Sequence, residues 1–267
     1  MAFSSLRALI GGGGGGGGGA RGVFGGGYDG SSFLNTIDYI TISSTGNATD
    51  FGDLTVARSR LGATSNGTTG RGVFGGGMIT GGTASNVIDY ITIGTTGNAT
   101  DFGDLTAARR GLTATSNGTT GRGVFGGGHD GSSYFNTIDY ITISSTGNAT
   151  DFGDLTLARQ NLAATSNGTS DRGVFGGGYT GSNSDVIDYI TISSTGNATD
   201  FGDLTLARQN LAATSNGTSG RGVFGGGTTG SVSNVIDYIT ISSTGNATDF
   251  GDLTDARQLY SAATSDA

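Results

Sequence analysis

The segment Arg21-Gly-Val-Phe-Gly-Gly-Gly27 decides the fold, because the chain returns to it four more times. The later copies begin at Arg71, Arg122, Arg172 and Arg221, so the spacings are 50, 51, 50 and 49 residues. Self-similarity at such a period is the signature of a repeat architecture. A residue that recurs in all five units is therefore interpreted first as part of the scaffold and only then as part of a site.

Each unit contains four candidate strands. The first is 61–65, which ends at the hairpin dipeptide Asn66-Gly67, and the second is 72–74, which runs into a glycine triplet. The third, 37–42, is apolar on both faces, so we expect it to lie between two layers. The fourth surrounds 51–54. No segment shows a sustained helical period, and the chain is therefore predicted to be all-β.

Four short strands repeated five times fit the blades of a β-propeller. The unit resembles a kelch repeat in its glycine cluster Gly25-Gly-Gly27, in Tyr39 on the third strand, in Phe51 on the fourth, and in the following Arg58. This resemblance covers about residues 21–267 and implies a five-bladed propeller of four-stranded, kelch-like blades. The chain departs from kelch in its third glycine, in Phe where kelch usually has Trp, and in a longer Tyr-to-aromatic spacing. A β-solenoid is the alternative, although its coils normally repeat at shorter periods.

Two segments compete for the first strand of the first blade. One is the C-terminal stretch 256–265, and the other is Leu6–Ile10 near the N-terminus. We expect the C-terminal strand to close the ring, because the nine glycines Gly11–Gly19 make a poor strand and hairpin. Residues 1–20 are then an N-terminal segment with a polyglycine linker, and 21–267 form the propeller, with units that start near 21, 71, 122, 172 and 221.

The composition argues against several functional classes. The net charge is −8, all 13 cations are Arg, and these are scattered among 21 Asp residues, so we expect no nucleic-acid binding. The chain has no Cys and therefore no disulfide framework or thiolate metal site. The apolar run at the N-terminus is too short for a signal peptide, and no stretch is long enough for a membrane helix. We expect no membrane insertion.

The five units differ from one another in two stretches, one after the glycine triplet and one around the recurring Ala-Arg pair. In an up-and-down blade, the connections that contain these stretches emerge on the same face, where a rigid scaffold displays recognition loops. Drift in unconstrained loops is the alternative explanation of this variation. Aromatic and polar tips on that face suit a glycan or a protein surface. The candidate ligand-binding residues are Tyr28, Asp29, Phe33, His129, Asp130, Tyr134 and Tyr179.

The recurring carboxylates are interpreted as scaffold. Asp38, Asp50 and Asp53 have counterparts in every unit, as do Arg21 and Arg58, so Arg–Asp pairs between blades are the simplest account. A calcium site that uses Asp50 and Asp53 is the weaker interpretation, because Asp-x-x-Asp alone lacks a dense ligand pattern. We expect no cofactor.

Catalysis is not expected. The chain has one His and no Cys, Lys or Glu, and no Ser-His-Asp motif surrounds His129. The predicted function is that of a non-enzymatic binding module on a virion or another extracellular surface appendage. It would recognise a cell-surface glycan or protein, or other subunits of the same particle. The sequence Gly-Asn-Ala-Thr-Asp-Phe-Gly-Asp-Leu-Thr is similar to that of uncharacterised repeat proteins of phages of aquatic bacteria. This similarity motivates the expected location on a virion or surface appendage. The alternative is a purely structural, self-assembling protein that forms stacks, filaments or homo-oligomers.

Overall fold

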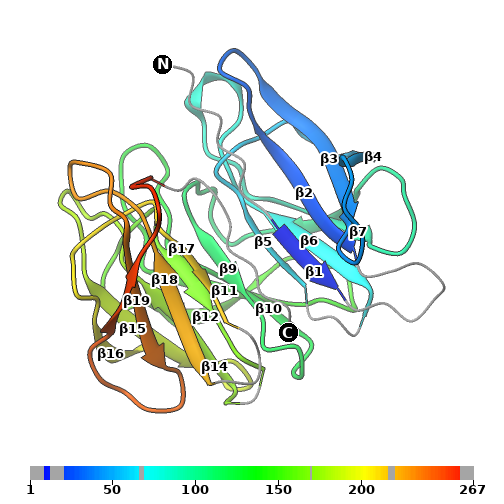
Figure 1. The fold of residues 1–267 in the computed structure, drawn as a ribbon. Coiled ribbons are helices and arrows are strands. Elements are labelled where there is room, and N and C mark those ends of the chain that lie inside the picture. The colour runs from blue at the N-terminus through cyan, green and yellow to red at the C-terminus, as the bar shows by residue number, and fades with distance from the viewer. Residues whose placement is uncertain (1–8, 13–20, 66–68, 169, 216–219, 259–267) are drawn as a thin grey trace.

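The protein is a five-bladed β-propeller in which each blade is a four-stranded antiparallel sheet (Figure 1). The computed structural model describes residues 9–12, 21–65, 69–168, 170–215 and 220–258. The all-β prediction and the blade count are confirmed. The strand order within every sheet follows the chain from the innermost to the outermost strand.

The strands of the first two blades are β1 (Leu9–Gly12), β2 (Arg21–Tyr28), β3 (Phe33–Thr41), β4 (Thr49–Asp53), β5 (Gly62–Ser65), β6 (Arg71–Gly75), β7 (Val87–Thr92) and β8 (Thr100–Asp104). A 3₁₀ turn, η1 (Thr80–Gly82), joins β6 to β7. The third and fourth blades consist of β9 (Thr113–Thr115), β10 (Arg122–Gly126), β11 (Thr137–Thr142), β12 (Thr150–Asp154), β13 (Ala163–Thr165), β14 (Arg172–Gly176), β15 (Val186–Thr191) and β16 (Thr199–Asp203). The fifth contains β17 (Ala212–Thr214), β18 (Arg221–Gly225), β19 (Val235–Thr240) and β20 (Thr248–Asp252).

The hydrophobic core is a series of layers between successive blades. The layer between the first two blades joins Phe51 and Leu54 of the first blade to Phe74, Ile91 and Ile93 of the second, all of them buried. Equivalent clusters lie at the next three junctions. This arrangement explains why the third strand of the second, third and fourth units is apolar on both faces, because one face packs on the preceding blade and the other on the next.

Each layer contains a buried ion pair between neighbouring blades. The guanidinium nitrogen of Arg58 lies 2.8 Å from the carboxylate of Asp89, and both side chains are fully buried. The same pair recurs at Arg109–Asp139, Arg159–Asp188 and Arg208–Asp237. The predicted inter-blade Arg–Asp pairs are thus confirmed for the Arg58 series.

The Arg21 series behaves differently from the prediction. The guanidinium carbon of Arg21 lies 4.4 Å from the centre of the Tyr39 ring in its own blade, and the group donates a hydrogen bond to the carbonyl of Ile93 in the next blade. Arg21, Arg71, Arg122 and Arg172 therefore stack on the tyrosine of the third strand and bind a backbone carbonyl of the next blade, whereas the buried ion pairs of the described residues involve the Arg58 series.

The glycine triplet lets adjacent blades approach closely. A Cβ atom on Gly25 would lie 2.7 Å from the ring of Phe74, and one on Gly26 would lie 2.5 Å from the carbonyl oxygen of Arg58. Gly26 also has a φ of 68°, in the left-handed region that favours glycine. The first glycine therefore makes room for the phenylalanine of the next blade, and the second allows the strand to turn against the backbone that follows β4.

The innermost strand of the first blade comes from the N-terminus. β1 pairs antiparallel with β2, with Leu9 opposite Phe24 and Gly12 opposite Arg21. This corrects the expectation that a C-terminal strand fills this position. Gly11 and Gly12 of the polyglycine run are part of the sheet, because pairing requires only backbone groups. Residues 259–267, which carry most of the expected closing strand, lie outside the described residues.

Candidate binding site on the variable face

The two variable stretches of the repeat lie against each other. Isolated β-bridges join Ser59 to Met78, Arg110 to His129, Gln160 to Tyr179 and Gln209 to Thr228. Each bridge connects the residue after the Ala-Arg pair to the residue after a glycine triplet. The prediction that both stretches share one face is therefore confirmed. We call this surface the variable face; it comprises residues 28–33, 78–84, 129–134, 179–183 and 228–232, together with 59–60, 110–111, 160–161 and 209–210.

Three of the predicted site residues form one aromatic cluster across two blades. The rings of His129 and Tyr134 are 4.8 Å apart between centroids, and those of Tyr134 and Tyr179 are 6.0 Å apart and close to perpendicular. His129 and Tyr134 belong to the loop between β10 and β11, whereas Tyr179 belongs to the loop between β14 and β15. All three side chains are half-buried. The cluster is thus held in place and still presents ring surface to solvent.

Arg110 borders this cluster and was not among the predicted site residues. Its guanidinium group donates hydrogen bonds to the Met78 sulfur, at 2.8 Å, and to the carbonyl oxygen of Gly82 in the neighbouring loop. Partial burial, together with the positive charge of Arg60, lowers the pKa of Arg110, and Asp130 opposes this shift. The signal that could have found Arg110 is register: the two variable stretches pair residue by residue, so Arg110 must lie beside His129.

The surroundings of His129 favour its neutral form. Desolvation and then the nearby Arg110 lower its pKa from the ordinary value of 6.5, and Asp130 opposes this effect. Its Nδ1 atom accepts a hydrogen bond from the backbone N–H of Gly131 at 3.0 Å. The neutral ring therefore carries its proton on Nε2, which is a donor available to a ligand.

The two predicted aspartates shape their loops. Oδ1 of Asp130 accepts hydrogen bonds from the backbone N–H groups of Ser132 and Ser133 at 2.7 and 2.8 Å. Asp29 does the same for Ser31 and Ser32 at 2.8 Å. These bonds lower the pKa of both carboxyl groups. The carboxylates thus fix the turns that display the aromatic side chains, in the manner of Asx turns.

Tyr28 and Phe33 form a separate pair on the first blade. Their ring centroids are 5.2 Å apart, and the rings are tilted by 52°. They face each other across the end of the β2–β3 hairpin. The ring contacts that the structure describes do not connect this pair to His129, Tyr134 or Tyr179. The predicted set is therefore divided into an aromatic cluster on the third and fourth blades and a pair on the first.

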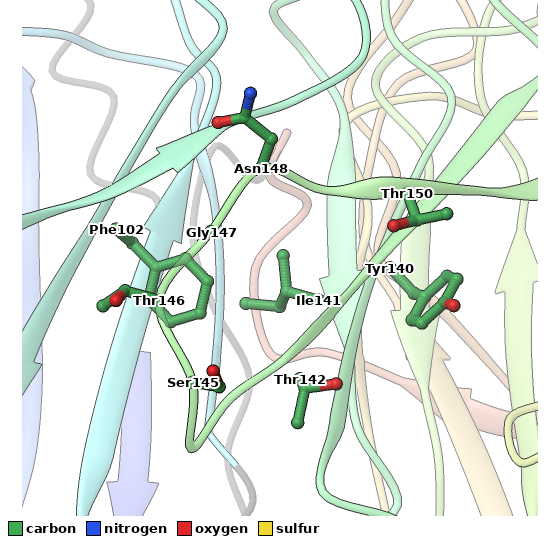
Figure 2. A pocket seen from close by; sticks show the side chains of 9 residues that line it. All are labelled: Phe102, Tyr140, Ile141, Thr142, Ser145, Thr146, Gly147, Asn148 and Thr150. Atoms are coloured by element: carbon green, nitrogen blue, oxygen red, sulfur yellow. The ribbon is translucent and has the colours of Figure 1, made fainter.

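A pocket of about 260 Å³ lies away from the variable face, where the second and third blades meet (Figure 2). Phe102 of the second blade and Tyr140, Ser145 and Asn148 of the third line it. The backbone N–H of Gly147 donates to the carbonyl of Phe102 at 2.7 Å beside it. Because Phe102, Tyr140 and Asn148 have identical counterparts in every unit, the pocket is best explained as a property of the junction between blades.

The described residues also bear on a metal site and on a membrane span. Across the described residues, no group of three or more His and Asp side chains is placed to hold a metal ion. The calcium interpretation of Asp50 and Asp53 gains no support there. The described part of the chain also has no helix long and apolar enough to cross a bilayer.

No protein family model and no curated protein sequence matches this chain. The comparisons therefore support neither the resemblance to kelch repeats nor the sequence similarity to phage repeat proteins. The propeller fold rests on the sheets and their junctions.

Proposed function

We propose that this protein is a non-enzymatic binding module that recognises a glycan through the aromatic cluster of its variable face. The observation that carries the proposal is the ring contact between Tyr134 and Tyr179, which joins the variable loops of two blades into one surface. These loops differ between units, whereas the strands beneath them repeat. Variable loops on a rigid, repeated scaffold are the usual arrangement of a recognition site.

The chemistry of the cluster suits a sugar. Half-buried aromatic rings offer flat apolar surface for the C–H face of a pyranose, and their fixed positions reduce the loss of entropy on binding. The Nε2–H group of His129 and the phenolic hydroxyls of Tyr134 and Tyr179 supply hydrogen bonds for sugar hydroxyls. Arg110 adds a positive charge beside the rings. The cluster therefore favours a glycan that carries a carboxylate, sulfate or similar anionic group.

The setting on a virion or surface appendage is part of this proposal. This location is supported by the amino-acid sequence of the repeat and by the variable face, which fits recognition of a cell surface. Immunogold labelling with an antibody against the protein would place it on particles or on cell surfaces. Labelling confined to the cell interior would contradict this setting.

A glycan array probed with the purified protein tests the binding function. We expect retention on anionic glycans, and we expect Tyr134→Ala or Tyr179→Ala to weaken binding by roughly tenfold or more. Thr228→Ala is the matched control, because Thr228 occupies the equivalent loop position on the fifth blade and has no aromatic neighbour in the described contacts. Absence of glycan binding, or binding that persists in both tyrosine variants, would reject the proposal and leave a protein surface as the ligand to seek.

A further inference from the structure

Each pair of consecutive blades meets through the same two faces. We call the side of a blade that faces the next blade its leading face, and the side that faces the preceding blade its trailing face. At the second junction, the leading face contributes Phe102, Gly103 and Arg109, and the trailing face contributes Asp139 and Gly147. These residues pack, pair or approach one another across the junction. The described residues form four junctions of this kind.

Among the described residues, nothing covers the leading face of the fifth blade in this way. Phe250 is 54% exposed, whereas its four counterparts are 2% exposed. A Cβ atom on Gly251 would meet nothing within 4 Å, whereas its counterparts Gly52, Gly103, Gly153 and Gly202 each lie against the glycine of the next blade. An aromatic ring that is buried at every other junction is thus left in contact with water.

The described residues leave the trailing face of the first blade uncovered as well. Ile42 is 54% exposed, and its counterparts in the other blades are at most 5% exposed. Phe24 is half-buried, although the four equivalent phenylalanines are fully buried. In Figure 1, the first sheet and the fifth sheet lie apart. Large exposed apolar side chains that cluster on one surface mark sites of association.

The charges on the two uncovered faces are complementary. Arg257 is the fifth member of the Arg58 series, and its backbone is placed like those of the others, with its carbonyl bound to Gly227 and its N–H bound to Ser233. Its side chain is exposed, however, and no described ion pair includes it. Asp38 is the first member of the Asp89 series, and it too lacks an ion pair among the described residues. The fifth blade thus offers the cation, and the first blade offers the anion, of the pair found at every internal junction.

We infer that the uncovered faces bind a second copy of this chain, with the leading face of one fifth blade docked on the trailing face of the partner's first blade. The contact would repeat the internal junction, with Phe250 buried and Arg257 paired with the Asp38 of the second copy. Because the two faces differ, the contact is head-to-tail, so it generates either a closed ring of several copies or a filament. This inference concerns a different surface from the variable face and does not rest on glycan binding.

Sedimentation velocity and light scattering of the purified full-length chain, over a range of concentrations, test the inference. We expect the average mass of the wild type to rise with concentration in multiples of the chain mass. Arg257→Asp or Asp38→Arg places like charges opposite each other and should weaken self-association at least about 100-fold. Because neither side chain has an ion-pair partner among the described residues of one copy, both variants should keep the wild-type circular dichroism spectrum.

Mixing the two variants separates contact between copies from closure within one copy. In the mixture, the Arg257 of one variant faces the Asp38 of the other, and the two introduced side chains also meet with opposite charges. We therefore expect association to return in the mixture, although each variant alone stays monomeric. If the two faces instead met within one chain, the double variant would restore the Arg–Asp pair, and mixing the single variants would not. That outcome would overturn the inference.

Two control variants address charge and hydrophobicity. Asp255→Arg reverses a charge two residues from Arg257, at a position whose counterparts Val56, Leu157 and Leu206 stay at least 36% exposed at formed junctions. It should leave association unchanged. Phe250→Ser should weaken association, whereas Val232→Ser, which alters a side chain that is 50% exposed on the variable face of the same blade, should not. A wild type that is monomeric at every concentration, or equal effects of Phe250→Ser and Val232→Ser, would also overturn the inference.

Discussion

The guanidinium group of Arg109 lies 2.7 Å from the carboxylate of Asp139 in the next blade, and neither side chain is accessible to solvent. Desolvation lowers the pKa of Arg109, and the charge of Asp139 opposes this shift. Two backbone carbonyls, those of Thr137 and Phe125, accept further hydrogen bonds at 2.6 and 3.3 Å. A buried cation is tolerated only where partners replace its water. The junction between blades therefore depends on this pair for its register.

Removal of the anion from a buried pair should destabilise the fold strongly. Asp139→Asn leaves the Arg109 charge buried without its counter-ion, and we expect the free energy of unfolding to fall by about 3–5 kcal/mol. Urea denaturation followed by circular dichroism measures this change. The control is Asp38→Asn, which alters the equivalent residue on the uncovered face. Measured at a concentration where the protein is monomeric, it should change stability by less than about 0.5 kcal/mol. Similar losses in the two variants would contradict this account of the junction.

Addition of one methyl group should discriminate between a covered and an uncovered junction. A Cβ atom on Gly126 would lie 2.7 Å from the ring of Phe175, so Gly126→Ala should reduce stability by about 1–3 kcal/mol. On Gly225, the nearest atom would be Cγ1 of Ile236 at 3.9 Å. Gly225→Ala should therefore be neutral or slightly stabilising in the monomer. Thermal unfolding of both variants measures the difference. A large loss in Gly225→Ala would show that the leading face of the fifth blade is covered within one copy.

His129 should titrate below its ordinary pKa of 6.5. It is the single histidine of the chain, so its two carbon-bound ring protons give one unambiguous pair of NMR signals that can be followed against pH. Arg110→Gln removes a positive neighbour and should raise the pKa of His129, whereas Asp130→Asn removes a negative neighbour and should lower it. Identical titration curves in the two variants would contradict the electrostatics of the cluster.

The same shift makes stability depend on pH. Above pH 6.5, His129 is neutral in both the folded and the unfolded chain, so it contributes no pH dependence. As pH falls below 6.5, the unfolded chain takes up the proton first, and the free energy of unfolding decreases until the pH reaches the lowered folded pKa. Urea denaturation at several pH values checks this sign. The slope between these limits should disappear in a His129→Gln variant.

The turn that contains Asn148, on the face opposite the variable face, should also contribute to stability where it meets the preceding blade. The side-chain oxygen of Asn148 accepts a hydrogen bond at 3.1 Å from the backbone N–H of Asp104 in the preceding blade. Asn148→Ala should therefore reduce the free energy of unfolding by about 0.5–1.5 kcal/mol. Asn47 is the equivalent residue of the first blade, where no blade precedes it, and Asn47→Ala should have no measurable effect on the monomer. Denaturant midpoints of the two variants provide the comparison.

Most of the fold could be predicted from the sequence, because the repeat fixes the number of blades and the two-sided apolar third strand fixes its position between layers. The contacts of Arg21 could not be predicted. Recurrence shows that a residue serves the scaffold, but it does not show which neighbour that residue contacts. The origin of β1 was also missed. Judged by propensity, polyglycine is a poor strand, yet Gly11 and Gly12 need only their backbone groups to pair with β2.

The candidate site remains a prediction, but part of its geometry follows from the sequence. Loop variation indicated that the variable stretches share one face, and their pairing follows from blade topology. The grouping of side chains depends on distances between blades, which a sequence does not contain. For this reason Tyr134 and Tyr179 meet, whereas Tyr28 and Phe33 form their own pair on the first blade. Arg110 was overlooked as a site residue because its importance comes from its neighbours and not from its own segment.

The repeated junction also has an evolutionary consequence. Every blade presents the same pair of faces, so a duplicated or deleted unit of about fifty residues leaves each remaining neighbour with a matching partner. Recombination between units can thus change the length of the array and shuffle its loops without a new interface having to arise. The constraint falls on the chemistry of one junction, and the number of blades is free to vary around it.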